Sequence, residues 1–286
     1  MVRLVVCDLD NTLYDWVSYF APSFYAMVDK VIEITDWDRE QLLDEFKKVH
    51  QEHHDIEHPF ALLETTLVRE KFPGKDLKAA KKYFDGAFHA FNSMRKKKLK
   101  TFPQVYETLD ILMKNNVSLV AHTDAKFYAV VDRLDRLDLT KYFQKVFCRE
   151  RADSSHPDGL SNEQWLEGFP AEKISELSHR QRKPDPSVLL EICAMMEADA
   201  SQTAYIGDSI AHDIKMAKDA GVFSIFAAYG TERDESHWAK LVRVTHWTEE
   251  DVIREAELRK ATRSVEADFV AKNSFAEILT PFGLSQ

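Results

Sequence analysis

Cysteine and glycine are scarce in this chain of 286 residues, which has three cysteines and eight glycines. The cysteines are an odd number, lie far apart and show no Cys-x-x-Cys spacing; they are Cys7, Cys148 and Cys193. This pattern argues against a disulfide framework and against a cysteine-rich zinc site, and it favours a reducing compartment.

Long apolar runs and an excess of positive charge are also missing. Nothing approaches the roughly 18 consecutive apolar residues of a membrane span. No signal peptide is expected at the N-terminus, because Arg3 is the only basic residue there and Asp8 interrupts the apolar run. The formal net charge of −10, from 38 basic and 48 acidic residues, argues against a nucleic-acid binder. We therefore expect a soluble cytoplasmic protein without membrane or nucleic-acid partners, either a monomer or a homodimer.

Two hydrophobic patterns divide the chain. From Trp16 to about Lys98, apolar residues recur three and four positions apart, which predicts four helices in a small bundle. From Thr101 onward, mostly apolar strands alternate with helices, which is typical of a parallel sheet covered on both faces. We predict an α/β fold with a Rossmann-like core, residues 1–14 and 100–286, and an inserted helical domain, residues 15–99. Two polar segments, 149–182 and 231–266, are expected to carry helical pieces of their own and receive no role.

The stretch DLDNTL places two carboxylates, Asp8 and Asp10, at the end of an apolar run. A side-chain period of two lets both turn toward the same side. A hard cation such as Mg²⁺ prefers oxygen ligands and would relieve their repulsion. Asp8 could also attack phosphorus as a nucleophile, and Asp10 could move the proton of the leaving group. The alternative is a turn that ends the strand, with Thr12 as a local cap.

Two further stretches contain groups that can bind phosphate. In LVAHTDA, Thr123 follows an apolar run, where its hydroxyl can hold a phosphoryl oxygen; a turn or a helix cap is the alternative. In RKPDPSVLLEI, Pro184 favours an extended Lys183, and Asp185 is expected to cap the helix that follows. An ammonium fixed there can neutralise a nucleophile and a phosphate. A solvated lysine is the alternative.

The stretch TAYIGDSIAHDIKMAKDAG predicts a strand, an acidic residue and a helix. Asp208 follows Gly207 at the end of the strand and is a candidate metal ligand. Asp213 lies five residues further on and could support the metal site through hydrogen bonds to its ligands, without binding the metal itself. The alternative is that Asp208 or Ser209 only caps the helix.

In their order and spacing, these residues resemble the haloacid dehalogenase-like hydrolase superfamily. The shared pattern is DxDxT, a Thr after a second strand, Lys-Pro, and Gly-Asp with a further Asp. It covers nearly the whole chain, including an all-helical cap inserted after the first motif. The resemblance points to the phosphatases of the family, because its dehalogenases lack an aspartate at the position of Asp10.

The same resemblance implies a chemical role for the aspartates. Asp8 would be the nucleophile that accepts the phosphoryl group, and Asp10 would be the general acid/base. Mg²⁺ would be held by Asp8, the backbone carbonyl of Asp10, and Asp208. The expected reaction is Mg²⁺-dependent hydrolysis of a small phosphorylated metabolite, such as a nucleotide or a sugar phosphate, through an aspartyl-phosphate. A phosphomutase with the same nucleophile and a catalytically silent binding module are the alternatives.

The resemblance also assigns residues to the phosphoryl group itself. Thr123 and Lys183 would bind and orient it, with Asn11 and Asp124 beside them, and Asp213 would support the metal or Lys183. Asp124 departs from the family, which usually has a small neutral polar residue there. A further carboxylate would repel phosphate unless it points away, binds metal or pairs with a cation.

Two clusters lie outside these motifs. The first is a run of aromatic residues after Asp10, of which one or two could stack on a base or sugar ring; we favour the alternative that they pack the first helix of the cap. These residues are Tyr14, Trp16, Tyr19, Phe20 and Phe24. The second is a group of histidines at 50, 53, 54 and 58, whose polar neighbours predict an exposed surface and to which we assign no metal.

Overall fold

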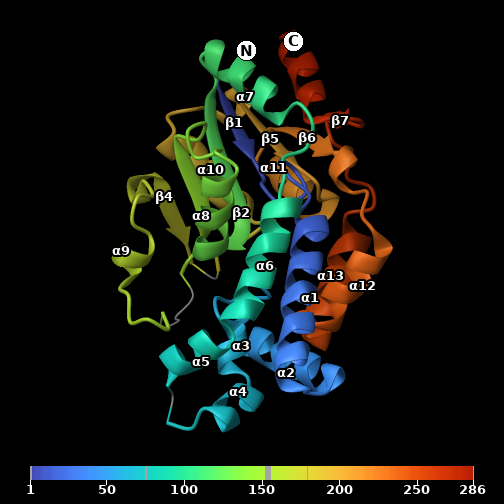
Figure 1. Ribbon diagram of the computed structural model, residues 1–286. Helices are drawn as coiled ribbons and strands as arrows, with labels where there is room; N and C mark the ends of the chain where they lie inside the picture. Colours follow the sequence, from blue (N-terminus) through green and yellow to red (C-terminus); the bar gives the residue numbers. More distant parts are fainter. Residues whose placement is uncertain (1, 75, 152–155, 179, 286) are drawn as a thin grey trace.

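A parallel β-sheet forms the centre of the molecule (Figure 1). The computed structural model describes residues 2–74, 76–151, 156–178 and 180–285, and in these the sheet has seven strands in the order β4-β3-β2-β1-β5-β6-β7. The strands are β1 (Leu4–Cys7), β2 (Ser118–Lys126), β3 (Lys145–Arg149), β4 (Ile174–Leu177), β5 (Thr203–Gly207), β6 (Phe223–Ala227) and β7 (Phe269–Ala271). The predicted α/β fold with a parallel sheet is confirmed.

Both faces of the sheet are covered, and β1 shows why its residues are apolar throughout. Leu4 and Val6 pack on one face, against the buried residues of α10 (Pro186–Met195) and α11 (Lys215–Asp219). Val5 and Cys7 pack on the other, with α7 (Val105–Lys114), α8 (Phe127–Arg136) and the 3-10 helix Phe275–Phe282. A strand buried on two faces needs no polar alternation, so its sequence is a continuous apolar run.

The connections of the sheet place a ligand site at the end of β1. From β1 the chain proceeds outward through β2, β3 and β4 on one side, and then through β5, β6 and β7 on the other. The connections therefore reverse direction between β1 and β5, which pair in parallel from Leu4 with Thr203 to Cys7 with Ile206. Ligands in open parallel sheets bind at such a reversal, outside the carboxyl ends of the strands.

Residues 16–98, which we call the helical segment, extend from the sheet to the lower end of the molecule in Figure 1. Six helices were found in its described residues where four were predicted, because Thr65 and Phe84 each divide a predicted helix. Thr65 has an extended backbone, and its hydroxyl caps the next helix by accepting from the Val68 N–H at 3.4 Å. The helices are α1 (Trp16–Thr35), α2 (Arg39–His53), α3 (Ala61–Glu64), α4 (Thr66–Lys71), α5 (Leu77–Tyr83) and α6 (Asp85–Lys98).

The chain enters and leaves the helical segment through two neighbouring stretches. Tyr14 forms an antiparallel bridge with Thr101, and the Phe102 N–H donates to the Leu13 carbonyl at 2.9 Å. Asp15 starts α1 by accepting from the Ser18 N–H at 2.9 Å. The start of α1 therefore lies directly after the loop that carries Asp8 and Asp10.

The two polar segments differ from each other. Segment 231–266 contains α12 (Glu235–Arg243), which lies beside α1 (Figure 1), and α13 (Glu249–Ala261); its predicted helical pieces are confirmed. The described part of segment 149–182 contains the short helix α9 (Asn162–Trp165), a 3-10 turn and β4. The edge strands β4 and β7 were not predicted, because ISEL and FVA are too short and too mixed to show a strand pattern.

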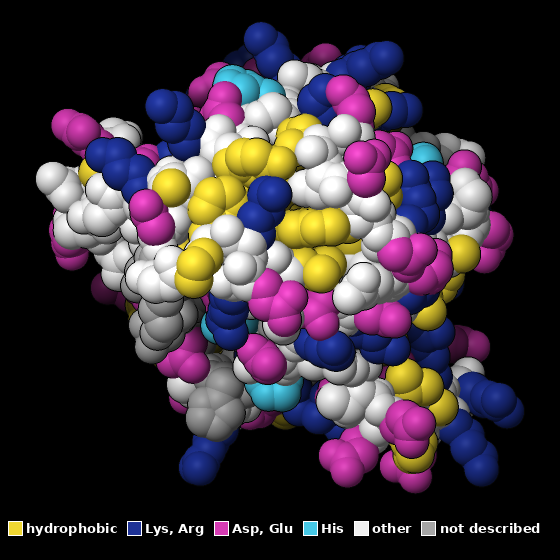
Figure 2. All heavy atoms as spheres, turned by 60° about the horizontal axis from the view of Figure 1, so that its bottom comes forward, with side chains coloured by type: hydrophobic (Ala, Val, Ile, Leu, Met, Phe, Trp, Pro, Cys, Tyr) yellow, Lys and Arg dark blue, Asp and Glu magenta, His cyan; other side chains and the backbone are white. Residues whose placement is uncertain are grey.

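The surface of the helical segment mixes apolar and charged groups. Seen from the lower end of the molecule, hydrophobic side chains gather near the middle of the face, and acidic and basic side chains surround them (Figure 2). Within the described residues, no helix combines the length and the apolar character needed to cross a membrane.

Candidate active site

Asp8 lies at the carboxyl end of β1 in a buried network of hydrogen bonds. The residue is 5% exposed. The Lys183 ammonium lies 2.5 Å from its Oδ1, and the Thr12 hydroxyl donates to its Oδ2 at 3.2 Å. Burial raises the pKa of Asp8 to about 7, Lys183 opposes this increase, and the Asp213 and Asp10 charges add to it. Thr12 therefore holds the candidate nucleophile instead of serving only as a turn cap.

Lys183 stands immediately before α10, as the Lys-Pro-Asp sequence predicts. Asp185 caps α10 by accepting from the Ser187 N–H at 2.9 Å. The Lys183 ammonium also contacts Oδ1 of Asp213 at 2.8 Å. Burial works to lower the pKa of Lys183, but the Asp213 and Asp8 carboxylates outweigh it and hold that pKa well above its usual range. The side chain is therefore a buried cation, and the solvated alternative is wrong.

Asp213 reaches this network from the π-helical turn Ile210–Ile214, which follows β5. Its Oδ2 accepts from the Ser209 N–H at 3.0 Å, and its Oδ1 accepts from the Tyr205 hydroxyl at 3.3 Å. Gly207 permits this approach, because a Cβ there would lie 2.3 Å from Cγ of Asp213. Only a residue without a side chain fits at the end of this strand.

The donor set beside Asp8 suits a hard divalent cation. One oxygen from each of Asp8, Asp208 and Asp213 lies within 4.8 Å of the others. Burial, and then the Asp8 and Asp213 charges, raise the pKa of Asp208 well above its usual range. Three carboxylates thus face one ammonium, and an added cation bound through oxygen would relieve their repulsion. The oxygens of Asp213 already accept from Lys183, Ser209 and Tyr205. Those of Asp8 accept from Lys183 and Thr12. Asp208 is thus the member of this set whose carboxylate is least engaged among the described residues.

Thr123 and Asp124 lie within β2, not after its end as the sequence had indicated. β1 ends opposite Ala121, so the last residues of β2 continue past it, beside the loop that carries Asp8. Thr123 is 2% exposed, and its hydroxyl accepts from the Ala125 N–H at 3.1 Å. Oδ1 of Asp124 accepts from the backbone N–H of Lys183 at 3.3 Å. Burial raises the pKa of Asp124, against the opposing charge of Lys183, so this unusual carboxylate is tied to the lysine motif.

Asn11 does not point its side chain into the Asp8 network. Its Oδ1 accepts from the Trp16 N–H at 3.1 Å, at the start of α1, and its φ of 55° is left-handed. Gly230 packs against it so closely that a Cβ there would lie 1.7 Å from the Asn11 carbonyl oxygen. The side chain of Asn11 therefore shapes the loop, and its expected place beside the phosphate stays a prediction.

The Asp10 side chain contacts a residue that was not identified from the sequence. Oδ2 of Asp10 lies 3.3 Å from Nη2 of Arg133, which is 1% exposed, and Oδ1 is buried with no partner among the described residues. Arg133 belongs to the buried face of α8 together with Val130 and Leu134. An arginine at helical spacing among these apolar residues was the signal that could have identified it.

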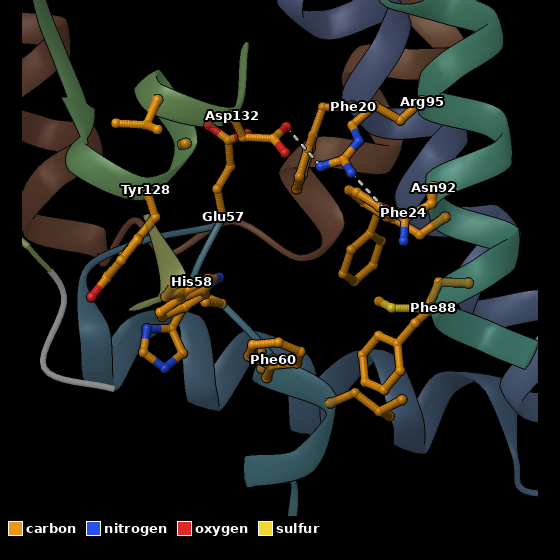
Figure 3. Close-up of a pocket in the computed structure, with 18 of the residues that line it drawn as sticks. Phe20, Phe24, Glu57, His58, Phe60, Phe88, Asn92, Arg95, Tyr128 and Asp132 are labelled. Carbon is orange, nitrogen blue, oxygen red and sulfur yellow. Dashed lines mark hydrogen bonds and ion pairs between the residues drawn. The ribbon is translucent and has the colours of Figure 1, made fainter. Parts of the chain in front are cut away.

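A cavity of about 670 Å³ lies between the helical segment and the core (Figure 3). Phe20, Phe24, Phe60 and Phe88 line it, and Tyr128 lies on the opposite side. Asp8, Asp10, Thr123 and Lys183 are not among its lining residues. Part of the predicted aromatic cluster thus belongs to α1 and also borders this cavity. Both interpretations of the cluster, stacking on a substrate ring and packing of the first helix, therefore remain predictions.

A second hollow of about 530 Å³ opens beside Asp208. Three arginines from the segment that had no assigned role line it: Arg233, Arg259 and Arg263. Arg259 is paired with Glu255 at 2.8 Å. The hollow therefore places positive charge next to one of the candidate metal ligands.

The histidines of α2 and the following loop are not all exposed, which corrects the sequence expectation. His50 and His58 are 1% and 4% exposed. The stacked rings of His53 and His58 both contact Glu64 through Nε2, at 2.8 and 2.7 Å. Burial works to raise the pKa of Glu64, but the hydrogen bonds from His58 and His53 outweigh it and lower that pKa to about 2. One carboxylate thus contacts both imidazoles, and each of His53, His58 and Glu64 offers one ligand atom within 4.8 Å of the others, so the expectation of no metal here stays untested.

Comparison with known proteins agrees with the arrangement of the motifs. A family model described as haloacid dehalogenase-like hydrolase matches residues 2–221, and a second, described as HAD-hydrolase-like, matches residues 181–272. The chain is 25% identical over 240 residues to a glyceraldehyde 3-phosphate phosphatase of Methanopyrus kandleri, covering 82% of this chain and 87% of that protein. It is 30% identical over 129 residues to a phosphoglycolate phosphatase of Pseudomonas syringae, covering 45% of this chain and 37% of that protein.

Among solved structures, the fold matches a 2-haloacid dehalogenase from Pseudomonas syringae with a TM-score of 0.58 and 20% identity, over 99% of both chains. At this identity the match concerns the fold alone.

Proposed function

The chain belongs to the haloacid dehalogenase-like hydrolases, and we propose that it is a phosphatase that hydrolyses small phosphate monoesters through an aspartyl-phosphate on Asp8. The observation that carries the proposal is the buried contact between Asp8 and Lys183 at 2.5 Å, at the point where the sheet connections reverse. A carboxylate and a fixed ammonium at that point suit phosphoryl transfer, which depends on positioning and on neutralising negative charge. The relatives named as phosphatases support the same reaction.

In the proposed mechanism, Asp8 attacks phosphorus while Lys183 and Thr123 orient the phosphoryl oxygens. Asp10 gives a proton to the ester oxygen as the bond to phosphorus breaks. Asp10 then takes a proton from the water that attacks the aspartyl-phosphate, which releases phosphate and restores Asp8. Asp213 keeps the ammonium of Lys183 in place.

Mg²⁺ is the proposed cofactor, with Asp8, Asp208 and the backbone carbonyl of Asp10 as the residues that would hold it. When bound, it supplies positive charge that offsets the negative charge of the phosphoryl group. The carboxylate oxygens within 4.8 Å of one another support this proposal.

We also propose that residues 15–99 act as a cap domain over a core formed by residues 1–14 and 100–286. The paired entry and exit stretches around Tyr14 and Thr101 support a hinge at this junction. The arginines beside Asp208 support a small anionic substrate, because they add positive charge to a protein with a net charge of −10.

The test is phosphate release from a panel of esters that includes phosphoglycolate, glyceraldehyde 3-phosphate, nucleotides, sugar phosphates and p-nitrophenyl phosphate, each with Mg²⁺. Release from at least one ester, at a rate far above that of the ester alone, is expected. No release from any of them would overturn the proposal.

Metal removal gives a separate prediction. Excess EDTA should abolish turnover, and Mg²⁺ in excess of the chelator should restore it, because Asp8 and Asp208 lose the charge that makes their proximity tolerable. Full phosphate release from protein shown by elemental analysis to be free of metal would remove Mg²⁺ from the account.

A further inference from the structure

A buried arginine joins Asp10 to the helical segment. Nη1 of Arg133 in α8 lies 2.6 Å from Oε2 of Glu57, and it donates to the Tyr19 hydroxyl at 3.2 Å. The Tyr19 hydroxyl in turn donates to Oε1 of Glu57 at 3.0 Å. Nη2 of Arg133 contacts Asp10 at 3.3 Å. Tyr19 belongs to α1, and Glu57 to the loop between α2 and α3, so one guanidinium bridges the two parts of the molecule.

The charges in this bridge depend on one another. Burial works to lower the pKa of Arg133, but the Asp10 and Glu57 carboxylates outweigh it and hold that pKa well above its usual range. Burial raises the pKa of Glu57, and Arg133 opposes that increase. A guanidinium that is 1% exposed needs carboxylate partners on both sides, so its position is determined by both of them.

The contacts of Arg133 are unequal. Its contact with Glu57 is 0.7 Å shorter than its contact with Asp10, from 2.6 and 3.3 Å. Glu57 also has the Tyr19 hydroxyl, whereas the other oxygen of Asp10 is buried and has no partner in the part of the chain that the structure describes. The helical segment therefore makes the shorter contact with Arg133, and within the described residues Arg133 is the charged group that forms an ion pair with Asp10.

We propose that Arg133 is a positioning residue for Asp10, and that through Glu57 and Tyr19 it makes proton transfer by Asp10 depend on contact with the helical segment. This inference rests on the proposed phosphatase function. When Asp10 gives its proton to the ester oxygen, the carboxylate that remains faces the Arg133 guanidinium, which stabilises the new charge. Without Arg133, Asp10 loses its orientation, while Asp8 keeps its contacts with Lys183 and Thr12.

The need for proton donation differs between substrates, and this difference isolates Asp10. An alkyl ester such as phosphoglycolate releases a basic alkoxide unless a proton arrives as the bond breaks. The p-nitrophenolate of p-nitrophenyl phosphate leaves as a stable anion and needs no proton. Loss of Asp10 orientation should therefore slow the alkyl ester far more than the aryl ester. A general loss of stability or of cap contact would slow both equally.

The chain offers a matched control on the same helix. Arg95 of α6 pairs with Asp132 of α8 at 2.8 Å, as Figure 3 shows, and this pair also joins the helical segment to the core. Among the described residues no hydrogen bond or ion pair joins this pair to Asp10, although the charges of Arg95 and Glu57 act on each other. The double variant Arg133→Met/Glu57→Gln removes the Arg133–Glu57 ion pair and the charged partner of Asp10. The double variant Arg95→Met/Asp132→Asn removes the Arg95–Asp132 pair and the contact of Asp132 with Arg136, and it leaves Arg133 and Asp10 unchanged.

The experiment compares kcat/KM for phosphoglycolate and for p-nitrophenyl phosphate in the wild-type protein and in both double variants. In Arg133→Met/Glu57→Gln, the value for phosphoglycolate should fall about tenfold or more beyond any fall for p-nitrophenyl phosphate. In Arg95→Met/Asp132→Asn, both values should change by the same factor. Equal losses for the two esters in both double variants would overturn the proposal.

If Arg133→Met/Glu57→Gln does not fold, the variant Arg133→Lys tests the same proposal. Arg133→Lys keeps the charge, but a single ammonium on a shorter side chain cannot hold Asp10, Glu57 and Tyr19 together. It should show the same selective loss for phosphoglycolate, and wild-type selectivity in this variant would contradict the proposal. A wild-type protein that hydrolyses neither these esters nor any other in the panel would instead reject the phosphatase function itself.

Discussion

At the scale of single residues, the site concentrates acidic groups around one cation. Burial raises the pKa of Asp8 to about 7 and moves that of Asp208 in the same direction, while Lys183 remains charged between Asp8 and Asp213. Carboxylates with raised pKa values beside a buried cation are typical of sites where carboxylates are used for chemistry. They also make the site sensitive to any change in the number of charges or in the space between them.

Asp8→Asn should lower phosphate release by about a thousandfold or more, because the amide cannot attack phosphorus. The fold should persist, since the side-chain volume is almost unchanged and an amide oxygen can still accept from Lys183. Thermal unfolding and phosphate release measure the two effects separately. Asp138→Asn, at an exposed carboxylate paired with Lys141, makes the same charge change away from the site and should keep full activity. Equal activity in the two variants would rule out Asp8 as the nucleophile.

Gly207→Ala should destabilise the protein by about 1–3 kcal/mol and also reduce turnover, because the new Cβ would lie 2.3 Å from Cγ of Asp213 and push that carboxylate away from Lys183. Denaturant unfolding and phosphate release are the measurements. Gly86→Ala is the control: it lies in α6, where a Cβ would meet Lys30 at an ordinary 3.5 Å, and it should be neutral or stabilising by about 0.5–1 kcal/mol. A Gly207→Ala variant as stable as this control would contradict the close approach.

At the scale of elements, α12 and the loop after it connect the core to the helical segment on a side remote from the Arg133 bridge. The Tyr25 hydroxyl of α1 donates to the Lys240 carbonyl at 3.2 Å. Arg243 pairs with Glu40 of α2 at 2.8 Å, and Nδ1 of His50 lies 2.7 Å from the Val244 carbonyl. Segment 231–266, to which the sequence assigned no role, therefore contacts both α1 and α2, and we call these contacts the brace.

This brace should weaken in acid. Burial, opposed by the hydrogen bond to Val244, lowers the pKa of His50 from 6.5 to about 4; Asp55 also opposes the shift, whereas His246 and His58 add to it. The unfolded chain binds the His50 proton below pH 6.5 and the folded chain only near pH 4. The free energy of unfolding should therefore fall by about 1.4 kcal/mol per pH unit between these values, and His50 should contribute no slope above them.

The measurement is denaturant unfolding across pH 4–7 for the wild-type protein and for His50→Asn, whose amide can still donate to the Val244 carbonyl. The variant loses ring packing and is less stable throughout, but its stability should fall less steeply as the pH decreases. Parallel curves for the two proteins would show that His50 does not titrate as its burial implies.

At the scale of the whole molecule, the elements that could be predicted from the sequence are those whose residues follow a regular hydrophobic pattern. Residues 2–7, 117–124 and 203–208 were predicted as mostly apolar strands, and they largely coincide with the central strands β1, β2 and β5. The strands β4 and β7 have three or four residues each and pair on one side only, so tertiary contact and not local pattern determines them. The splitting of two predicted helices at Thr65 and Phe84 likewise follows from packing that periodicity does not record.

The candidate site was predictable where a motif follows a strand, as at Asp8 and Asp208, and where the Lys-Pro-Asp sequence places Lys183 before a helix. Contacts of the site that join residues far apart in the sequence were not predictable. Arg133 and Glu57 are separated by 76 positions, and no local signal links them. The orientation of Asn11 also escaped prediction, because the start of α1 and the close approach of Gly230 determine it.

The most direct test of the account is to look for the phosphoryl group on Asp8. The wild-type protein is mixed with the best ester of the panel and Mg²⁺, quenched in acid during turnover, digested, and analysed by mass spectrometry. We predict one phosphoryl group on the peptide that contains Asp8, and none on the same peptide of Asp8→Asn. Steady phosphate release with no phosphoryl group on that peptide, or with the group on another residue, would contradict the mechanism.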